Sequence, residues 1–398
     1  MTYDRIHFLF LNVGHFFDHM FVLIFASAAA LSLTSEWGMT YAQLIPYATP
    51  GLVAFGALAV PVGWLADKWS RESMMAIFFI GIGASSAFTA LAATPLQIGV
   101  GLFFIGVFAA IYHPVGIAMV VHGRKNTGVP LAINGIFGNM GIAVAALMTG
   151  LLIDSNGWRA AFVLPGILSI GVGIAYIFFI RSGRATRAVE MANGTAAKKA
   201  AAGTMTIDRN LLIRTFAIIF VTTAIGGFIV RSTTFSLPKV FDERLTGIAD
   251  NATLIGAYSF LVFALAAFSQ LVVGFLIDRY SIKVIFAFVA LMQAVFFLAM
   301  LNLTGVPALL VSFGFMLMVF GQIPINDVLV GRVSRSEWRS RAYAFRYIIT
   351  FSVAAMAVPM IAWIHAEWSF VILFAVMAIG ATGTFAMALL LPSTVAKP

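Results

Sequence analysis

The sequence predicts an all-α membrane protein with twelve transmembrane helices in two pseudo-symmetric six-helix bundles. Hydrophobic residues make up 61% of the 398 positions and charged residues only 10%, whereas soluble domains contain about 25% charged residues. Apolar runs of about 20 residues, long enough to cross a bilayer as helices, recur along the whole chain. These runs lack the alternation of apolar and polar residues that a transmembrane β-barrel needs. We therefore expect a lipid bilayer to surround most of the chain.

The second observation is a polar hinge between two apolar runs that occurs twice. It runs from Gly63 to Arg71 and again from Gly274 to Ser281, with glycine, leucine, aspartate, a cation, an aromatic residue and serine in the same order. Recurrence at about half the chain length indicates two copies of one unit. We predict an N-terminal bundle over residues 1–181, a cytoplasmic linker over 182–210 and a C-terminal bundle over 211–398. The linker is rich in Gly, Ala, Thr and Lys, and we expect it to be partly helical at most.

The apolar runs give the approximate bounds of each helix. In the first bundle we expect helices over 6–33, 41–66, 73–93, 96–122 and 129–153, and a sixth that follows a turn at Trp158 and Arg159 and ends near 181. In the second bundle we expect helices over 211–237, 252–277, 284–303, 308–330, 343–364 and 368–391.

The distribution of cations predicts the orientation in the membrane. The net charge of +9 comes from cations that lie between the apolar runs, so positive-inside topology explains it better than a nucleic-acid partner. With both termini in the cytoplasm, only Arg159, Lys239 and Arg244 lie outside. We expect a monomer in a bacterial inner membrane, with both hinges facing the cytoplasm. The chain contains no cysteine, which excludes disulfides and thiolate metal sites.

The two hinges resemble the loops of the major facilitator superfamily, which carry a Gly-x-Leu-x-Asp-(Lys/Arg) turn between the second and third helices of each half. The matching residues are Gly63, Leu65, Asp67, Lys68 and Arg71 in the first half, and Gly274, Leu276, Asp278, Arg279 and Lys283 in the second. The resemblance implies two halves that rock about a central site, with these loops closing a cytoplasmic gate. The expected gate residues are Gly63, Asp67, Arg71, Gly274, Asp278 and Asp327. Ordinary turn residues at a membrane surface are the alternative interpretation.

Helix 1 carries the densest set of polar residues within the membrane, namely Asn12, His15, Asp18 and His19. Their spacing of three and four places them on one stripe of the helix near the middle of the bilayer. Polar and ionisable groups at this depth are costly and indicate a functional site. We expect the stripe to face a central cavity.

Three further helices contribute polar groups at similar depth. Helix 4 contains Tyr112 and His113 followed by Pro114, which predicts a kink. The register of the two hinges maps Arg231 of helix 7 onto Met20, one position from His19, and so places it across the pseudo-twofold axis from the helix 1 stripe. Helix 5 contains closely spaced glycines and Asn139, without the Gly-Pro pair that is usual in drug/proton antiporters of the superfamily.

Near the cytoplasmic ends of helices 10 and 11, we expect Asp327 to pair with Arg346, although Arg346 could instead contact substrate. The candidate residues for substrate binding or proton coupling are His15, Asp18, His19, Tyr112, His113, Asn139, Arg231 and Arg346.

The helix 1 cluster has three possible roles. Histidine titrates near neutral pH, so His15 and Asp18 suit proton coupling. The residue types His15, Asp18, His19 and His113 also suit zinc or a similar ion. The third role is a satisfied polar cluster that holds helix 1 to its neighbours.

These observations predict a secondary active transporter that works by alternating access, with an ion gradient and no cofactor. The buried arginines favour a small substrate with a negative charge. Gly14, His15 and Asp18, together with Tyr112, His113 and Pro114, are similar to fosmidomycin-resistance-like exporters, which implies proton-coupled efflux, by antiport, of an anionic or zwitterionic metabolite or antibiotic. Organic-acid uptake or exchange is an alternative, and divalent-metal transport through His15, Asp18 and His19 is another. Motifs of a nucleophile and base near a membrane face are missing, so we do not expect an enzyme.

Overall fold

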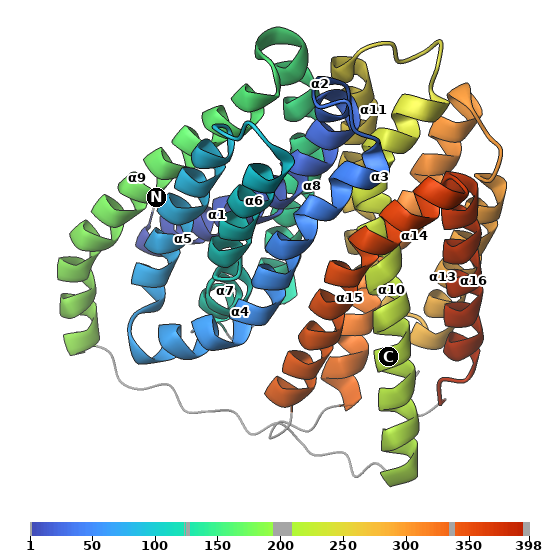
Figure 1. Cartoon of the computed structure of the whole chain (residues 1–398). Helices are drawn as coiled ribbons and strands as arrows, with labels where there is room; N and C mark the ends of the chain where they lie inside the picture. Colours follow the sequence, from blue (N-terminus) through green and yellow to red (C-terminus); the bar gives the residue numbers. More distant parts are fainter. Residues whose placement is uncertain (1, 123, 125–127, 194–208, 334–338, 393–398) are drawn as a thin grey trace.

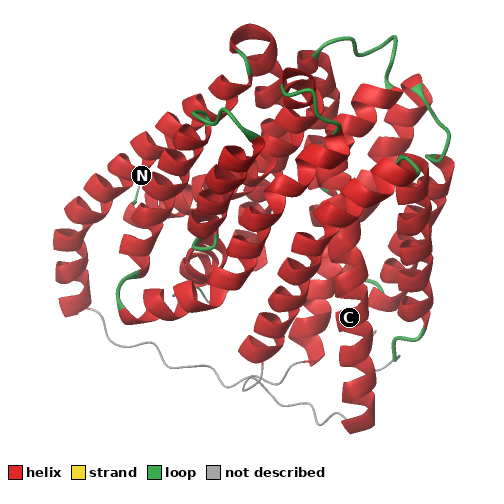
Figure 2. Cartoon of the chain, viewed as in Figure 1, coloured by secondary structure: helices red, strands yellow, loops and turns green. Residues whose placement is uncertain are grey.

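The computed structural model describes residues 2–122, 124, 128–193, 209–333 and 339–392 (Figure 1). Within these ranges the chain forms helices joined by short loops and no strand (Figure 2). Twelve helical segments are long and apolar enough to cross a membrane. The predicted all-helical architecture is therefore confirmed.

The helices of the first half lie close to their predicted bounds. They are α1 (Tyr3–Ala28) continued by η1 (Ala29–Leu33) and α2 (Thr34–Glu36), α3 (Tyr41–Leu44) continued by η2 (Ile45–Ala48) and α4 (Thr49–Lys68), α5 (Arg71–Thr89), α6 (Pro95–Ala109) followed by η3 (Tyr112–Gly116) and α7 (Ile117–Val121), α8 (Gly128–Asn156), and α9 (Trp158–Asn193).

The helices of the second half are α10 (Arg209–Arg244), α11 (Ala252–Ala267), α12 (Ser269–Ile277), α13 (Ile282–Ala299), α14 (Gly305–Val333), α15 (Arg339–Glu367) and α16 (Phe370–Leu389). In two places the bounds differ clearly from the prediction: α9 continues to Asn193, so the first part of the predicted linker is helical, and α10 continues to Arg244, beyond the predicted end at 237. Residues 194–208 of that linker lie outside the described ranges, and the predicted division of the chain at 182–210 stays a prediction.

Helices α1 to α9 gather on the left of Figure 1 and α10 to α16 on the right. The two groups, here called the N and C bundles, pack on each other mainly through α8 against α11 and through α4 against α15. Helix α1 also contacts α10 across the same boundary. Residues from α1 and α10 can therefore meet between the bundles.

The two ends of the bundles differ in how they are joined. We call the end with the turns after Lys68 and Ile277 the hinge face, and the other end the opposite face. At the opposite face the Tyr41 hydroxyl donates a hydrogen bond to the Phe235 carbonyl at 3.3 Å. There, too, the backbone N–H and hydroxyl of Thr253 donate to the Asp154 carboxylate at 2.7 and 2.6 Å. Hydrogen bonds thus link the N and C bundles at the opposite face.

Glycines of α8 allow its close approach to two neighbouring helices. A Cβ atom at Gly141 would overlap the carbonyl oxygen of Phe16 in α1, and one at Gly150 would overlap the carbonyl oxygen of Ala252 in α11. Contact at this distance requires a residue without a side chain. The small residues predicted to pack helix 5 closely therefore do so, and they set the position of α1.

Candidate functional site

Helix α1 presents its polar stripe to the interior of the protein. His15 is 7% exposed and Asp18 is 0% exposed, whereas His19 is half-buried. The steps of three and four residues place all three on one side of the helix, as the sequence predicted.

His113 comes from the break in the fourth transmembrane segment. Helix α6 ends at Ala109, and the backbone then forms the π-helical turn η3 from Tyr112 to Gly116. Pro114 has no N–H to donate to the regular helical ladder, and such π-turns are frequent at functional sites. The predicted distortion at Pro114 is confirmed, and the turn carries His113 toward α1. Gly63, in α4, lies against this turn. A Cβ atom added at Gly63 would lie 3.2 Å from the Cβ of Pro114.

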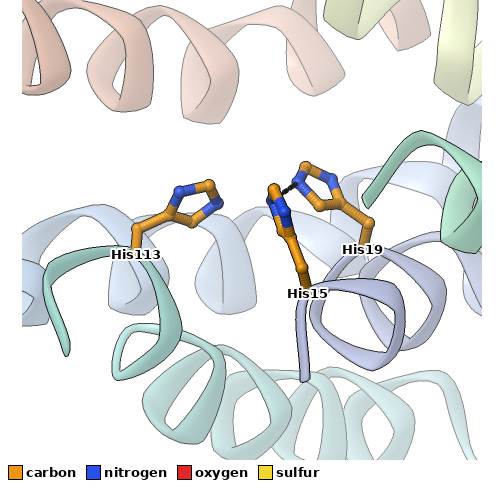
Figure 3. Close-up of side chains that lie close together, drawn as sticks. All are labelled: His15, His19 and His113. Carbon is orange, nitrogen blue, oxygen red and sulfur yellow. Dashed lines mark hydrogen bonds between the residues drawn. The ribbon is translucent and has the colours of Figure 1, made fainter. Parts of the chain in front are cut away.

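The three histidine rings converge (Figure 3). Nε2 of His19 lies 3.1 Å from Nε2 of His15, and the ring of His113 stands at right angles to that of His15 with 5.4 Å between centroids. One ligand atom from each of the three rings lies within 4.8 Å of the other two. Nε2 of His113 is also 3.3 Å from Oδ2 of Asp18. The helix 1 cluster thus has a fourth member on a second helix.

A hydrogen-bond network around Asn134 of α8 holds His15 in place. Nδ1 of His15 lies 2.7 Å from the Asn134 carbonyl, which can only accept, so Nδ1 carries the proton and Nε2 presents its lone pair. The Asn134 amide donates to Oδ1 of Asn12 at 2.9 Å and to the Tyr112 hydroxyl at 2.8 Å. The Tyr112 ring stacks on His15 with 4.8 Å between centroids. Position, tautomer and ring orientation of His15 are therefore all defined.

Asn134 is the site residue that the sequence analysis missed. A polar amide within a membrane helix is itself a signal of a functional site. Tyr112 and Asn139, which the analysis did select, are both buried. The Tyr112 hydroxyl donates to the Leu11 carbonyl at 2.8 Å, so it supports α1. The Asn139 amide nitrogen has no hydrogen-bond partner among the described residues.

Arg231 approaches the cluster from the C bundle. Its guanidinium lies 5.0 Å from the centre of the Phe235 ring and close enough to Asp18 and His19 to interact with both electrostatically. In the described part of the chain it forms no ion pair with a carboxylate. The structure therefore places Arg231 opposite the helix 1 stripe, as the hinge register predicted, and leaves its charge without a direct counter-ion.

Arg346 of α15 forms an ion pair with Asp327 of α14. Arg346 is 8% exposed, whereas 43% of the Asp327 side chain is exposed. The pairing predicted for neighbouring helices is confirmed. This engagement favours a structural or gating role for Arg346 over substrate contact.

The Asp327–Arg346 pair is testable by a charge reversal. We expect Asp327→Arg or Arg346→Asp alone to lower the free energy of unfolding by about 1–3 kcal/mol, because each leaves like charges facing one another at a partly buried position. The double reversal should recover a good part of that loss. Thermal or denaturant unfolding of the purified protein measures it in a double-mutant cycle. If the losses in free energy of unfolding of the two single variants simply add in the double variant, Asp327 and Arg346 do not stabilise the protein by direct pairing.

The two hinges lie at the surface in this conformation. Asp67 pairs with Arg71 of its own hinge at 2.5 Å, with side chains 64% and 38% exposed. Asp278 is exposed, and an added Cβ at Gly274 would have no other residue within 4 Å. Neither hinge aspartate closes a gate here, and the gate role of Gly63, Asp67, Arg71, Gly274, Asp278 and Asp327 stays a prediction.

Comparison with known proteins adds a family and several relatives. Residues 11–263 match the family model described as Major Facilitator Superfamily. A probable sulfoacetate transporter of Cupriavidus necator is 24% identical over 157 residues, which are 39% of this chain and 36% of that protein. A probable hexose phosphate transport protein of Chlamydia pneumoniae is 25% identical over 152 residues, 38% of this chain and 33% of that protein. The matches thus span only about a third of these relatives.

The likeness to solved structures covers the whole chain. The crystal structure of a D-xylose–proton symporter superimposes with a TM-score of 0.72 at 13% identity, covering 99% of each chain. Identity this low supports the shared fold and nothing finer.

Proposed function

We propose that this chain, which belongs to the Major Facilitator Superfamily, transports small organic anions and binds them through Arg231. The family and the relatives are transporters rather than enzymes, and secondary transport of a small substrate follows from them. The anionic nature of the substrate and the role of Arg231 are the steps that we add.

The observation that carries the proposal is the unpaired guanidinium at the boundary between the bundles. An arginine at this depth in a membrane protein is costly unless something compensates its charge. Asp18 interacts with it only through space, and Asp18 already lies beside His113. A guanidinium can bind a carboxylate, sulfonate or phosphate through two parallel hydrogen bonds. An anionic substrate would therefore supply the counter-charge that Arg231 lacks.

The names of the relatives support this choice. Sulfoacetate carries a sulfonate and a carboxylate, and hexose phosphate carries a phosphate. These anions differ in size and shape but share oxygen atoms that suit an arginine. They define the first panel of substrates to test.

Substitution of Arg231 tests the proposal. We expect Arg231→Ala in proteoliposomes to bind the transported anion about 10- to 100-fold more weakly, the loss expected for charge-assisted hydrogen bonds of 1.5–3 kcal/mol. Arg214→Ala is the matched control, because Arg214 lies on the same helix α10 but is exposed at its end. Counterflow of labelled sulfoacetate and hexose phosphate provides the measurement. Equal affinity in the wild type and Arg231→Ala, with Arg214→Ala also unchanged, would exclude Arg231 as the anion partner.

The direction and the driving ion are separate questions. Proton-coupled efflux, predicted from the sequence, and organic-acid uptake both remain open proposals for this site. Flux in inside-out and right-side-out vesicles, with an imposed pH gradient and with that gradient collapsed, distinguishes them.

A further inference from the structure

We infer that His15, His19 and His113 form a binding site for a divalent transition-metal ion such as Zn²⁺. The inference goes beyond anion transport and does not depend on it. The sequence already grouped these histidines with Asp18 as possible zinc ligands, and the structure brings the three rings together from α1 and η3.

The spacing of the nitrogen atoms fits one ion. Two nitrogens bound to a tetrahedral zinc at about 2.05 Å lie about 3.3 Å apart. Nε2 of His15 and Nε2 of His19 are 3.1 Å apart, close to this spacing. The third ring offers a nitrogen within 4.8 Å of both, and Figure 3 shows the three rings beside one another, with the hydrogen bond between His15 and His19. His113 would have to move its nitrogen closer to the other two when an ion binds.

His15 already has the hydrogen bond that orients a metal-binding histidine. A zinc-binding histidine usually donates its other N–H to a carbonyl or carboxylate, which fixes the tautomer and aims the lone pair at the ion. His15 does this with the Asn134 carbonyl at 2.7 Å and is stacked on Tyr112. The lone pair of its Nε2 is therefore on the side of His15 that faces His19. An ion would bind there, in contact with both Nε2 atoms.

Charge also favours a cation at this point. Asp18 is 0% exposed, and neither of its oxygens accepts a hydrogen bond from the described residues. Burying a carboxylate is expensive, and here His113 at 3.3 Å and, through space, Arg231 offset the cost in part. A divalent ion held beside His113, 3.3 Å from Asp18, would compensate it.

The donor set indicates the class of metal. Neutral imidazoles suit Zn²⁺, Ni²⁺ and Cu²⁺, whereas Mg²⁺ prefers oxygen ligands. Three protein ligands leave a fourth position open to water, Asp18 or another ligand. His19 is half-buried, and 17% of the His113 side chain is exposed. In the absence of metal, a hydrogen bond from His19 to His15 gives the same short distance, and binding measurements separate the two explanations.

The test uses the full-length purified protein with Zn²⁺, Co²⁺ and Mg²⁺ alone, and no organic anion. We expect one Zn²⁺ per chain by titration against a chelator, and visible absorption bands of tetrahedral Co²⁺. His19→Ala and His113→Ala should each weaken Zn²⁺ binding at least about tenfold, while His7→Ala, which removes a buried imidazole from the same helix α1, should not. His7 bonds to Tyr176 and lies eight residues before His15, about 12 Å along α1.

Two results would overturn the inference: Zn²⁺ binding in the His19→Ala/His113→Ala variant that equals the wild type, or a Mg²⁺ response that equals the Zn²⁺ response. Thermal unfolding without metal shows whether each variant is folded, and His19→Ala serves as the milder change because the His19 ring bonds only to His15 among the described residues. Because no anion is present, failure here leaves the proposed anion transport untouched, and the converse also holds.

Discussion

Cross-linking Asp154→Cys to Thr253→Cys is expected to stop transport. Substrate flux should fall to the level measured in liposomes without protein. Oxygen atoms of the two side chains lie 2.6 Å apart and join α8 of the N bundle to α11 of the C bundle at the opposite face. Alternating access requires the bundles to separate at each face in turn. A covalent link at this point would hold the opposite face closed, so substrate could not reach the site from that side.

The chain provides a clean background for this experiment because it contains no cysteine. A short thiol-specific cross-linker forms the link, reduction removes it, and flux is measured before and after. Glu36→Cys with Arg159→Cys is the matched control, since those side chains lie 3.1 Å apart at the same face but within the N bundle. Only the Asp154–Thr253 pair should arrest transport. Full flux in the cross-linked protein would show that the bundles do not separate there.

The helices themselves were predictable because a bilayer imposes length and hydropathy on each segment. Interruptions within a segment were harder to predict. The eighth segment divides at Phe268 into α11 and α12, although no proline or glycine is present at the break. The end of α9 at Asn193 was likewise not predicted, because the Gly, Ala, Thr and Lys composition after Arg181 indicated a linker that is partly helical at most, although alanine favours a helix. Local composition alone does not decide these points.

Within the site, spacing predicted the stripe of His15, Asp18 and His19, and the repeat register predicted Arg231 opposite it. Both inferences rest on geometry that is fixed by a helix or by a repeated unit. The distance from His113 to this stripe was not predictable, because it depends on the rotation of η3 and the packing of α6. In the structure the side chain that lies beside Asp18 is His113, with 3.3 Å between Nε2 and Oδ2.

Gly141→Ala is expected to destabilise the N bundle by about 1–3 kcal/mol or more, the usual cost of overpacking a core. The new methyl group would overlap the Phe16 carbonyl oxygen and lie 3.2 Å from the Met20 amide nitrogen, so α1 itself must move. Backbone atoms cannot rotate away as a side chain can.

The matched control for this prediction is Gly135→Ala in the same helix α8, where the nearest atom, Oε1 of Gln270, is 3.5 Å from the added Cβ. That change should leave stability equal or slightly higher, because alanine is the better helix former by about 1 kcal/mol. Thermal unfolding in detergent measures both variants. Displacement of α1 would also pull His15 from the Asn134 carbonyl, so Gly141→Ala should weaken Zn²⁺ binding while Gly135→Ala does not. Equal midpoints of thermal unfolding for the two variants would mean that the contact between α1 and α8 is looser than the structure shows. The packing of these helices would then not explain the orientation of His15.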